Sequence, residues 1–201
     1  MKFNNKELSD RNLKRVMRIG NIAAKLFNTK GYLQTTMDDI TTAARFSKGG
    51  IYHYFSSKDE ILFFVLDRYM NLVLQDLEHN LEEIAPAREK IQYIISRHIQ
   101  LYTQNPAEAK TLLNEKHCLP RKYRQKIDRK EREYFQIVRQ VLIIFFADRH
   151  KLPDYRITVI TFLLFGACNW IFSWYDPKGA VNSEALSEII WKIFLNGVDG
   201  F

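Results

Sequence analysis

The stretch TTMDDITTAARFSKGGIYHYFSSKDE, residues 35–60, decides the fold because it contains three helix starts in close succession. Thr36 can cap a helix whose third residue is Asp39, so that the hydroxyl and the carboxylate accept from amides that the helix leaves free. Ser47 can cap a second helix, and Ser57 opens a third with the same kind of capping box. The stretch therefore predicts two short helices joined by a tight turn and followed by a longer helix.

Apolar residues upstream of this stretch predict a supporting helix. They recur at three- and four-residue spacing over residues 10–29, and Gly31 can end the helix because glycine tolerates positive φ. A helix-turn-helix unit has this layout: a first helix, then a short helix, a tight turn and another short helix. Strand patterns are nearly absent from the chain, so we expect an all-α protein with a three-helix DNA-binding domain at its N-terminal end.

Prolines and apolar spacing predict further helices in a larger C-terminal part. Proline is favoured at the first helical position, where its missing N–H costs nothing. The last two predicted helices carry apolar residues on more than one face, which favours a subunit interface as well as an intrachain core. Helices are expected over residues 57–83, from Pro86, from Pro106, and over residues 120–148, 153–175 and 183–196, with Gly197 behind the last.

The positive charge of the chain is concentrated near its N-terminal end. The 201 residues carry a net charge of +7 at pH 7. Residues 1–58 hold eleven Lys and Arg against four acidic side chains, and the remaining residues are balanced. This asymmetry favours an N-terminal module that faces a polyanion, and charge alone leaves a merely solvated basic face as the alternative.

The short helix after Ser47 combines two glycines with large polar aromatic side chains. In a helix-turn-helix unit this helix enters the major groove, and Gly49 and Gly50 carry no side chain to hold its backbone away. Each glycine costs about 1 kcal/mol relative to alanine, and burial of Ile51 and Phe55 can offset that cost. The opposite face then presents groups that can donate to phosphates or base edges: Lys48, Tyr52, His53 and Tyr54.

Two side chains at neighbouring helix starts are placed for backbone phosphates. Thr36 caps the helix before the turn, and Lys58 lies at the start of the helix that follows. Ordinary packing is the alternative for each aromatic residue, and it is the expected fate of Phe55. We therefore predict DNA contact for the polar residues of this segment and packing for its apolar ones.

A longer run, LFNTKGYLQTTMDDITTAARFSKGGIYHYFSSKDEIL at residues 26–62, resembles the DNA-binding domain of the TetR family of bacterial transcription regulators. Its Gly-Tyr, Thr-Thr, Ser-Lys-Gly and Tyr-x-Tyr-Phe motifs follow one another in the family's order. The resemblance implies an all-helical homodimer, with a DNA-binding domain at residues 1–57 and an effector-binding and dimerisation domain at residues 58–201.

The resemblance also implies a mode of action and a set of DNA contacts. Family members usually repress, bind palindromic double-stranded operators, and release them when a small molecule enters the second domain. Gly50 stands where family members vary. When the family's DNA-contacting positions are transferred to this sequence, they fall on Thr36, Ser47, Lys48, Gly49, Tyr52, His53, Tyr54 and Lys58.

In the family, helices of the second domain surround an effector cavity and the last two helices of each subunit form a four-helix bundle. Arg121 and Arg124 begin a basic run that can recognise an anionic group such as a coenzyme A phosphate, although a solvated face with ion pairs is the alternative. The other side chains that we expect at the effector are Phe63, Tyr102, His117, Phe162, Trp170 and Trp174.

The ending NWIFSWYDPKGAVNSEALSEIIWKIFLNGV, residues 169–198, resembles the branch of TetR regulators associated with fatty-acid or sterol catabolism. Effectors in that branch are acyl-CoA molecules. We therefore expect a small hydrophobic effector, with an acyl-CoA as one form of it. A regulator of multidrug efflux that responds to hydrophobic drugs or dyes is the alternative within the family.

Other classes of protein find little support in the sequence. It contains no GxSxG, HExxH, P-loop or dinucleotide motif, so we expect no enzyme, cofactor or metal site. Neither a membrane span nor a secretory signal is visible, and Cys118 and Cys168 fit free thiols in the cytoplasm. An architectural DNA-binding protein without an effector would need little beyond its first 60 residues, and the long aromatic-rich remainder argues against it.

Overall fold

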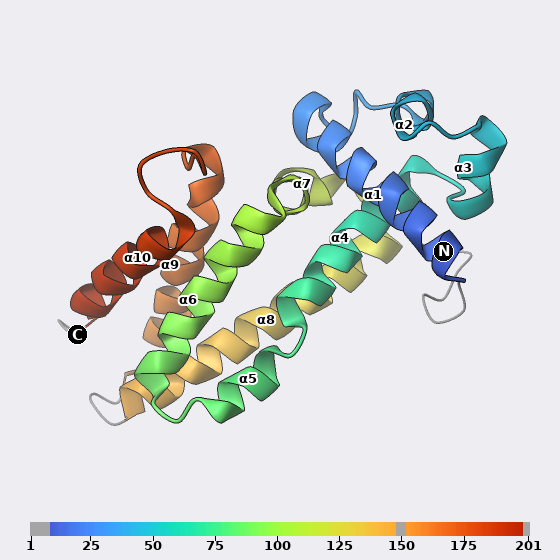
Figure 1. Ribbon diagram of the computed structural model, residues 1–201. Coiled ribbons are helices and arrows are strands. Elements are labelled where there is room, and N and C mark those ends of the chain that lie inside the picture. Colours follow the sequence, from blue (N-terminus) through green and yellow to red (C-terminus); the bar gives the residue numbers. More distant parts are fainter. Residues whose placement is uncertain (1–8, 148–151, 199–201) are drawn as a thin grey trace. The chain divides into compact units, whose positions relative to one another are not determined.

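The computed structural model describes residues 9–147 and 152–198, and these ranges contain helices and no strand (Figure 1). The all-α prediction is confirmed. In chain order the elements are α1 (Asp10–Lys30), α2 (Met37–Ala44), α3 (Lys48–Tyr54), α4 (Lys58–Leu74), α5 (Leu77–Glu83), α6 (Ala87–Gln104), α7 (Pro106–Glu115), the 3-10 helix η1 (Lys116–Cys118), α8 (Arg121–Ala147), α9 (Asp154–Asn169), the 3-10 helix η2 (Trp170–Ser173) and α10 (Ser183–Val198).

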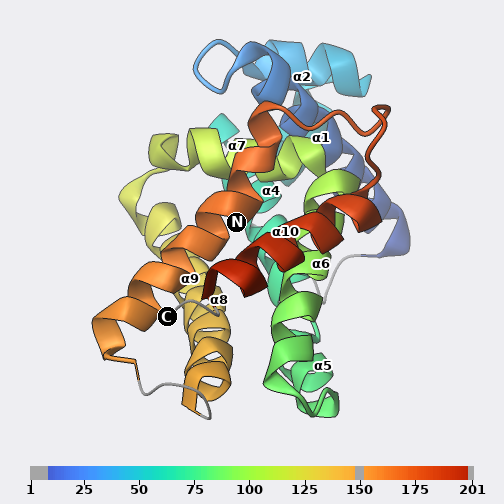
Figure 2. The same ribbon diagram turned by 90° about the vertical axis from the view of Figure 1, so that its left-hand side faces the viewer.

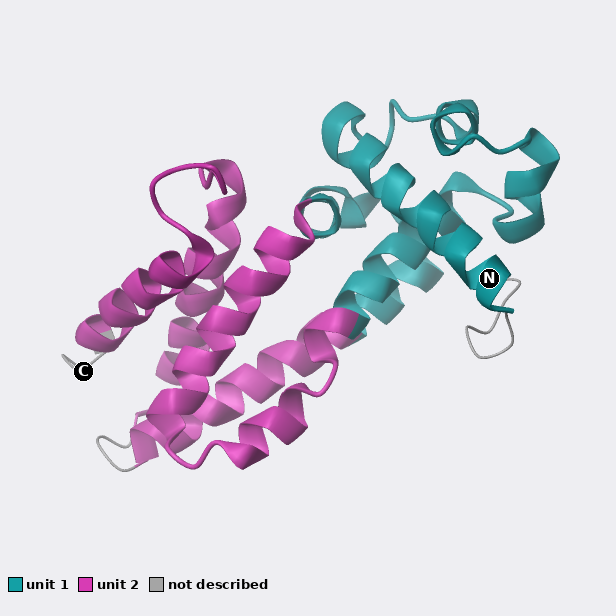
Figure 3. Ribbon diagram, viewed as in Figure 1, with its two compact units in different colours: residues 1–71, 107–129 teal, residues 72–106, 130–201 magenta. Residues whose placement is uncertain are grey.

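The chain forms two compact units, which we describe separately (Figure 3). Unit 1 comprises Met1–Asn71 and Ala107–Arg129, and unit 2 comprises Leu72–Pro106 and Lys130–Phe201. The divisions fall within α4, after the first residue of α7, and within α8. The functional boundary predicted between residues 57 and 58 lies between α3 and α4, and it stays a prediction.

The core of unit 1 is built where α1, α2 and α3 meet. Ile19, Phe27, Ile40 and Ile51 are at most 1% exposed, so each of the three helices buries at least one large side chain. This burial offsets the low helix propensity of the glycines in α3. A methyl group on Gly20 would come within 2.6 Å of the Phe64 ring, so α1 needs glycine where it passes this ring.

The capping box predicted at α2 forms, whereas only half of the one predicted at α4 does. Thr36 Oγ1 accepts from the amide of Asp39 at 3.0 Å, and the Asp39 carboxylate accepts from the amide of Thr36 at 2.8 Å. The ammonium of Lys30, together with Thr36, lowers the pKa of Asp39 to about 2, which keeps the cap charged. At α4, Ser57 Oγ accepts from the Glu60 amide at 3.2 Å, whereas the Glu60 carboxylate accepts from the amide of Ser56 rather than Ser57.

The predicted long helix over residues 57–83 is wrong, because the chain breaks between α4 and α5. Asp76 has φ 55°, a left-handed conformation that Asp tolerates better than most residues. The carbonyls freed by the break find a donor in Arg97. Its Nη2 atom lies 2.9 Å from the Leu72 oxygen and 2.5 Å from the Gln75 oxygen. A side chain of α6 therefore satisfies the end of α4.

The ends of the last two helices also differ from prediction. Asn169 ends α9, which was expected to continue to residue 175, and the chain turns through the 3-10 helix η2 instead. Gly197 was expected behind the last helix, yet α10 includes it and runs to Val198. The predicted end of α8 at residue 148 lies outside the described residues.

Unit 2 is organised around α6 and α10. Figure 2 shows α10 crossing α6 with α9 beside it, and α10 packs most extensively on α6. Leu186, Trp191 and Leu195 of α10 are buried, as are Ile91 and the other isoleucines along α6. The guanidinium of Arg88 lies 5.7 Å from the centre of the Trp191 ring.

Helix α9 is apolar on two faces. Ile157, Ile160 and Leu164 are buried, while Val159 and Leu163 remain 53% and 65% exposed. By length and composition alone, the segment Asp154–Ser173 could cross a membrane. A helix that packs on one face within its own subunit and on the other against a second subunit has the same composition.

Candidate functional site

Helix α3 presents one face to solvent and buries the other. Ser47 Oγ accepts from the amide of Gly50 at 3.1 Å, so the predicted cap forms. Ile51 is fully buried, whereas Tyr52 is 39% exposed and His53 is exposed. A Cβ atom added to Gly49 would meet no atom within 4 Å, which leaves the backbone of this turn bare.

Charged and polar groups surround this bare backbone. Lys48 Nζ lies 3.2 Å from Asp38 Oδ1 of α2, and both side chains are largely exposed, so the pair holds Lys48 at the surface. Thr36 and Ser47, at the starts of α2 and α3, are exposed as well. Six of the eight predicted DNA contacts are therefore accessible: Thr36, Ser47, Lys48, Gly49, Tyr52 and His53.

The prediction that Tyr54 lies on the exposed face is wrong. Tyr54 is only 3% exposed, because it follows Ile51 by three residues and so shares the buried face of the helix. Its hydroxyl donates to Asn12 Oδ1 at 2.9 Å and accepts from Arg15 Nη1 at 3.3 Å. Tyr54 therefore fastens the end of α3 to the first turns of α1.

Lys58 is not presented to phosphates as predicted. Its ammonium donates to the carbonyl oxygens of Tyr32 at 2.8 Å and Thr35 at 2.7 Å, and it lies 4.2 Å from the centre of the Tyr32 ring. A cation is disfavoured by the dipole at the start of α4, and these carbonyls offset that cost. The Tyr32 hydroxyl bonds Asp59. Burial first, and then this carboxylate, raise the pKa of Tyr32.

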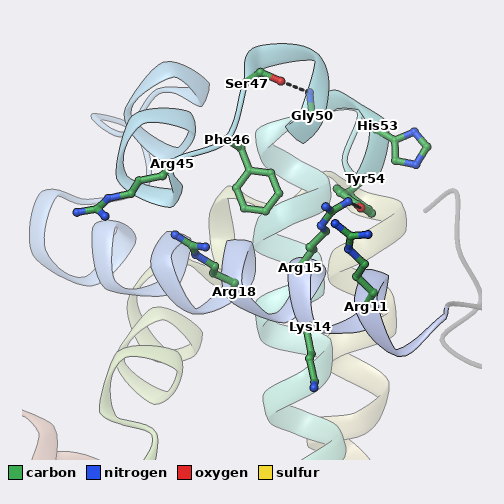
Figure 4. Close-up of a pocket in the computed structure, with 10 residues that line it drawn as sticks. All are labelled: Arg11, Lys14, Arg15, Arg18, Arg45, Phe46, Ser47, Gly50, His53 and Tyr54. Atoms are coloured by element: carbon green, nitrogen blue, oxygen red, sulfur yellow. Dashed lines mark hydrogen bonds between the residues drawn. The ribbon is translucent and has the colours of Figure 1, made fainter.

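A basic groove, defined by Arg11, Lys14, Arg15 and Arg18 of α1 and by Arg45 after α2, lies beside α3 (Figure 4). Its volume is about 670 Å³, and Ser47, Gly50, His53 and Tyr54 also line it. Arg45 ends α2 in the left-handed conformation, and the guanidinium of Arg18 lies 5.8 Å from the centre of the Phe46 ring.

The net charge of residues 1–58 includes the cations of the groove. It does not predict that they lie together on one surface. A signal was present in the sequence, since residues 11, 14, 15 and 18 have the i, i+3, i+4, i+7 spacing of one helix face. Throughout the ranges that the structure describes, no carboxylate forms an ion pair with Arg11, Lys14, Arg18 or Arg45. Among the described residues, no acidic side chain therefore compensates these four positive charges.

The predicted effector residues of unit 1 have ordinary surroundings. Phe63 is buried and stacks on Tyr123 with ring centres 4.6 Å apart, so it is a core residue. His117 is exposed, and its Nε2 atom lies 3.4 Å from the sulfur of Cys118. Arg121 and Arg124 are exposed in the first turn of α8.

The predicted effector residues of unit 2 do not converge on one enclosed space. Phe162, Trp170 and Trp174 are 62%, 63% and 58% exposed at the surface of the unit. Phe162 contacts Phe135, with ring centres 4.7 Å apart. Only Tyr102 lies inside, 4% exposed. Its hydroxyl oxygen is buried without a hydrogen-bond partner among the described residues, and burial raises its pKa to about 12.

A partly buried polar cluster in unit 2 was not predicted. His98 Nδ1 lies 3.1 Å from the hydroxyl of Tyr134, and His98 Nε2 lies 3.0 Å from Asn169 Oδ1. Burial lowers the pKa of His98 to about 4, so the ring is neutral near pH 7. Tyr102 is one turn further along the same face of α6. An isolated histidine gives no signal in the sequence, because its partners lie 36 and 71 residues away.

The thiols and acidic groups show no metal chemistry. Cys118 and Cys168 are both free, and Cys168 is buried. Over residues 9–147 and 152–198, no group of three or more His, Cys, Asp or Glu side chains is arranged to hold a metal ion.

Two protein-family models match the chain. Residues 21–64 match the model described as bacterial regulatory proteins, tetR family. Residues 85–198 match the model described as the tetracyclin repressor-like C-terminal domain. The residues that match the first model include α2 and α3, and those that match the second include α6 to α10.

Relatives extend over nearly the whole chain. The fatty acid metabolism regulator protein of Bacillus subtilis (strain 168) is 24% identical over 183 residues, which are 90% of this chain and 94% of that protein. The crystal structure of a TetR-family transcriptional regulator from Bordetella parapertussis 12822 superposes with a TM-score of 0.85 at 27% identity, covering 96% of this chain and 98% of that one. AibR, crystallised with isovaleryl coenzyme A and operator DNA, gives a TM-score of 0.79 at 25% identity over 89% of this chain and 97% of its own.

Proposed function

Because the chain belongs to the TetR family of bacterial regulatory proteins, we propose that α3 is its recognition helix and that the protein represses transcription by occupying an operator. The observation that carries this proposal is the exposed face of α3. Lys48, Tyr52 and His53 surround the bare backbone at Gly49, while Ile51 anchors the opposite face. Such a face can approach base edges closely and still donate hydrogen bonds to them.

The chemistry of this face suits a DNA duplex. Lys48 can donate to phosphate oxygens or to a guanine edge, and the Tyr52 hydroxyl and the His53 ring can donate to phosphates. Thr36 and Ser47 flank them at helix starts. We assign the protein to the cytoplasm, where it meets its DNA, and to the regulators rather than the enzymes.

A homodimer would present two such faces to a palindromic operator. The exposed apolar stripe of α9, formed by Tyr155, Val159, Phe162 and Leu163, supports this arrangement, and Ile193 of α10 is 68% exposed. A symmetric pair of recognition helices reads two inverted half-sites, because the operator then shares the two-fold symmetry of the protein.

For the signal, we propose a small hydrophobic effector, with an acyl-CoA as the first compound to test. The buried hydroxyl of Tyr102 could donate to a ligand carbonyl, and His98 lies one turn away in a neutral, partly buried cluster. A largely apolar site with a few polar groups is typical of ligand pockets. AibR was crystallised with isovaleryl coenzyme A, which supports this choice.

The experiment that tests the DNA contact measures fluorescence anisotropy of promoter fragments with the purified protein. Lys48→Ala and Tyr52→Ala are each expected to weaken specific binding about tenfold, the size of a single base or phosphate contact. Sedimentation should still show a dimer. Lys178→Ala removes an exposed charge in unit 2 and is the matched control. Wild-type affinity in both α3 variants would remove the assignment of α3.

The same complexes serve to test the effector. Isovaleryl-CoA added to the preformed complex is expected to release the DNA, and Tyr102→Phe should raise the concentration required without changing DNA affinity. Release by hydrophobic cationic dyes alone would contradict the acyl-CoA proposal and favour a regulator of drug efflux.

A further inference from the structure

The basic groove lies beside α3, and four of its five cations belong to α1, outside the recognition helix. We infer that this groove binds backbone phosphates of the DNA strand flanking the base pairs that α3 reads, with Arg15 as its central ligand. The inference rests on the proposed function, and it extends the DNA contact from α3 onto α1.

The spacing of the cations on α1 fits a DNA strand. Arg11 and Arg18 are seven residues apart, which is about 10 Å along a helix. A DNA strand advances about 3.4 Å along the duplex axis for each phosphate. The row from Arg11 to Arg18 is therefore long enough to face more than one phosphate of a strand, and Lys14 and Arg15 stand within it.

Arg15 has a defined orientation because Tyr54 bonds it. The Tyr54 hydroxyl accepts from Arg15 Nη1 at 3.3 Å and donates to Asn12 Oδ1 at 2.9 Å. Tyr54 is the last residue of α3, whereas both of its partners belong to α1. The guanidinium is therefore held at a set position relative to the recognition helix, and a phosphate contact by Arg15 would fix the register of α3 on the duplex.

One cation from a second element, Arg45, also lines the groove. Arg45 extends from the end of α2, and Figure 4 shows its guanidinium and that of Arg18 on the side of the groove away from Arg11 and His53. Packing over the Phe46 ring restrains the Arg18 head group. Positive groups gathered around one hollow concentrate anions there more strongly than isolated surface charges do.

The test compares wild-type protein with the double variant Arg11→Gln/Lys14→Gln. Both side chains are exposed, so the fold should be kept. A plot of log affinity against log salt should become shallower by about 0.9 for each phosphate that the variant no longer neutralises. Affinity should fall by the same factor for the operator and for an unrelated duplex, because phosphate contacts do not read sequence. Arg129→Gln, an exposed cation of unit 1 outside the groove, is the control with an unchanged slope.

A second measurement locates the contact. Single methylphosphonates, which are neutral, replace phosphates on either side of the half-site one at a time. Two or three of these replacements should weaken wild-type binding. In the double variant the effect should disappear at the phosphates that Arg11 and Lys14 bind and persist at the phosphate that Arg15 binds. Tyr54→Phe keeps the ring and removes the hydroxyl that bonds Arg15, so it should reduce the effect at the phosphate that Arg15 binds while leaving the preference for operator over unrelated DNA intact.

Three results would overturn the inference while leaving α3 as the recognition helix. They are an unchanged salt slope in the double variant, methylphosphonate effects equal in both proteins, and a reduction of affinity confined to the operator. Failure of the proposed function gives a different result, since the wild-type protein would then bind operator and unrelated DNA alike, which would overturn both proposals.

Discussion

Gly49 and Gly50 are neighbours in α3 with different surroundings. A Cβ atom on Gly50 would lie 3.0 Å from Ser47 Oγ and 3.6 Å from the Phe46 ring, so an added methyl group would press on the cap of the helix. A Cβ atom on Gly49 would meet nothing within 4 Å. Packing within the subunit therefore gives no reason for glycine at position 49, whereas close approach of DNA does.

Gly49→Ala is accordingly expected to separate stability from binding. The free energy of unfolding should rise by up to about 1 kcal/mol, because alanine favours a helix more than glycine does, while DNA affinity should fall because the methyl group enters the interface. Urea unfolding and fluorescence anisotropy measure the two effects. Gly197→Ala in α10 is the matched control, since that site is also open, and it should leave DNA affinity unchanged. Full DNA affinity in Gly49→Ala would contradict the proposed clearance.

The capping roles that were predicted correctly depend on local chemistry. Thr36 and Ser47 bond amides three residues away, so their roles could be predicted from the adjacent sequence. Tyr54 and Lys58 were assigned wrongly, because their partners Asn12 and Tyr32 lie 42 and 26 residues away. A polar side chain in a recognition segment looks the same in the sequence whether it faces DNA or fastens two helices together.

At the level of elements, the helices and most of their starts could be predicted, and their ends were less certain. Prolines and caps predicted where α6, α7 and α8 begin. The break after α4 was missed because it depends on Arg97, which supplies a donor to the freed carbonyl of Gln75, 22 residues before it. Such a contact has no pattern in the local sequence.

His98 connects three elements of unit 2 and makes their stability depend on pH. Its partners Tyr134 and Asn169 lie on α8 and α9. Burial lowers its pKa in the folded protein to about 4 from 6.5. Unfolding therefore takes up a proton below pH 6.5, so the stability due to this group is complete above pH 6.5 and is lost as the pH falls toward 4.

The loss of stability between pH 6.5 and pH 4 is expected to be on the order of 3 kcal/mol larger in wild-type protein than in His98→Gln. Glutamine keeps hydrogen-bonding groups at this position but does not titrate. Urea unfolding at several pH values measures the difference. His79→Gln, at an exposed histidine, should keep the wild-type pH dependence. Parallel pH profiles for wild type and His98→Gln would show that the ring is not held neutral.

For the whole molecule, the apolar surface and the charge were predicted better than the ligand. Apolar residues on two faces of α9 predicted an interface, and Val159 and Leu163 are indeed exposed. The concentration of basic residues near the N-terminal end predicted a polyanion, and the basic groove gathers five of them. The positions of the effector residues were the least predictable. The sequence predicted that Phe162 and Trp170 line a ligand pocket, yet both lie at the surface of unit 2.

The central claim is that the protein is a dimeric repressor that reads DNA with α3. Selection of tight-binding duplexes from a random pool, followed by native mass spectrometry of the selected complex, tests this claim most directly. We expect enrichment of two inverted copies of one short sequence, two protomers on each such palindrome, and weaker enrichment with Lys48→Ala. Recovery of unrelated sequences, or of a single half-site bound by one protomer, would contradict it.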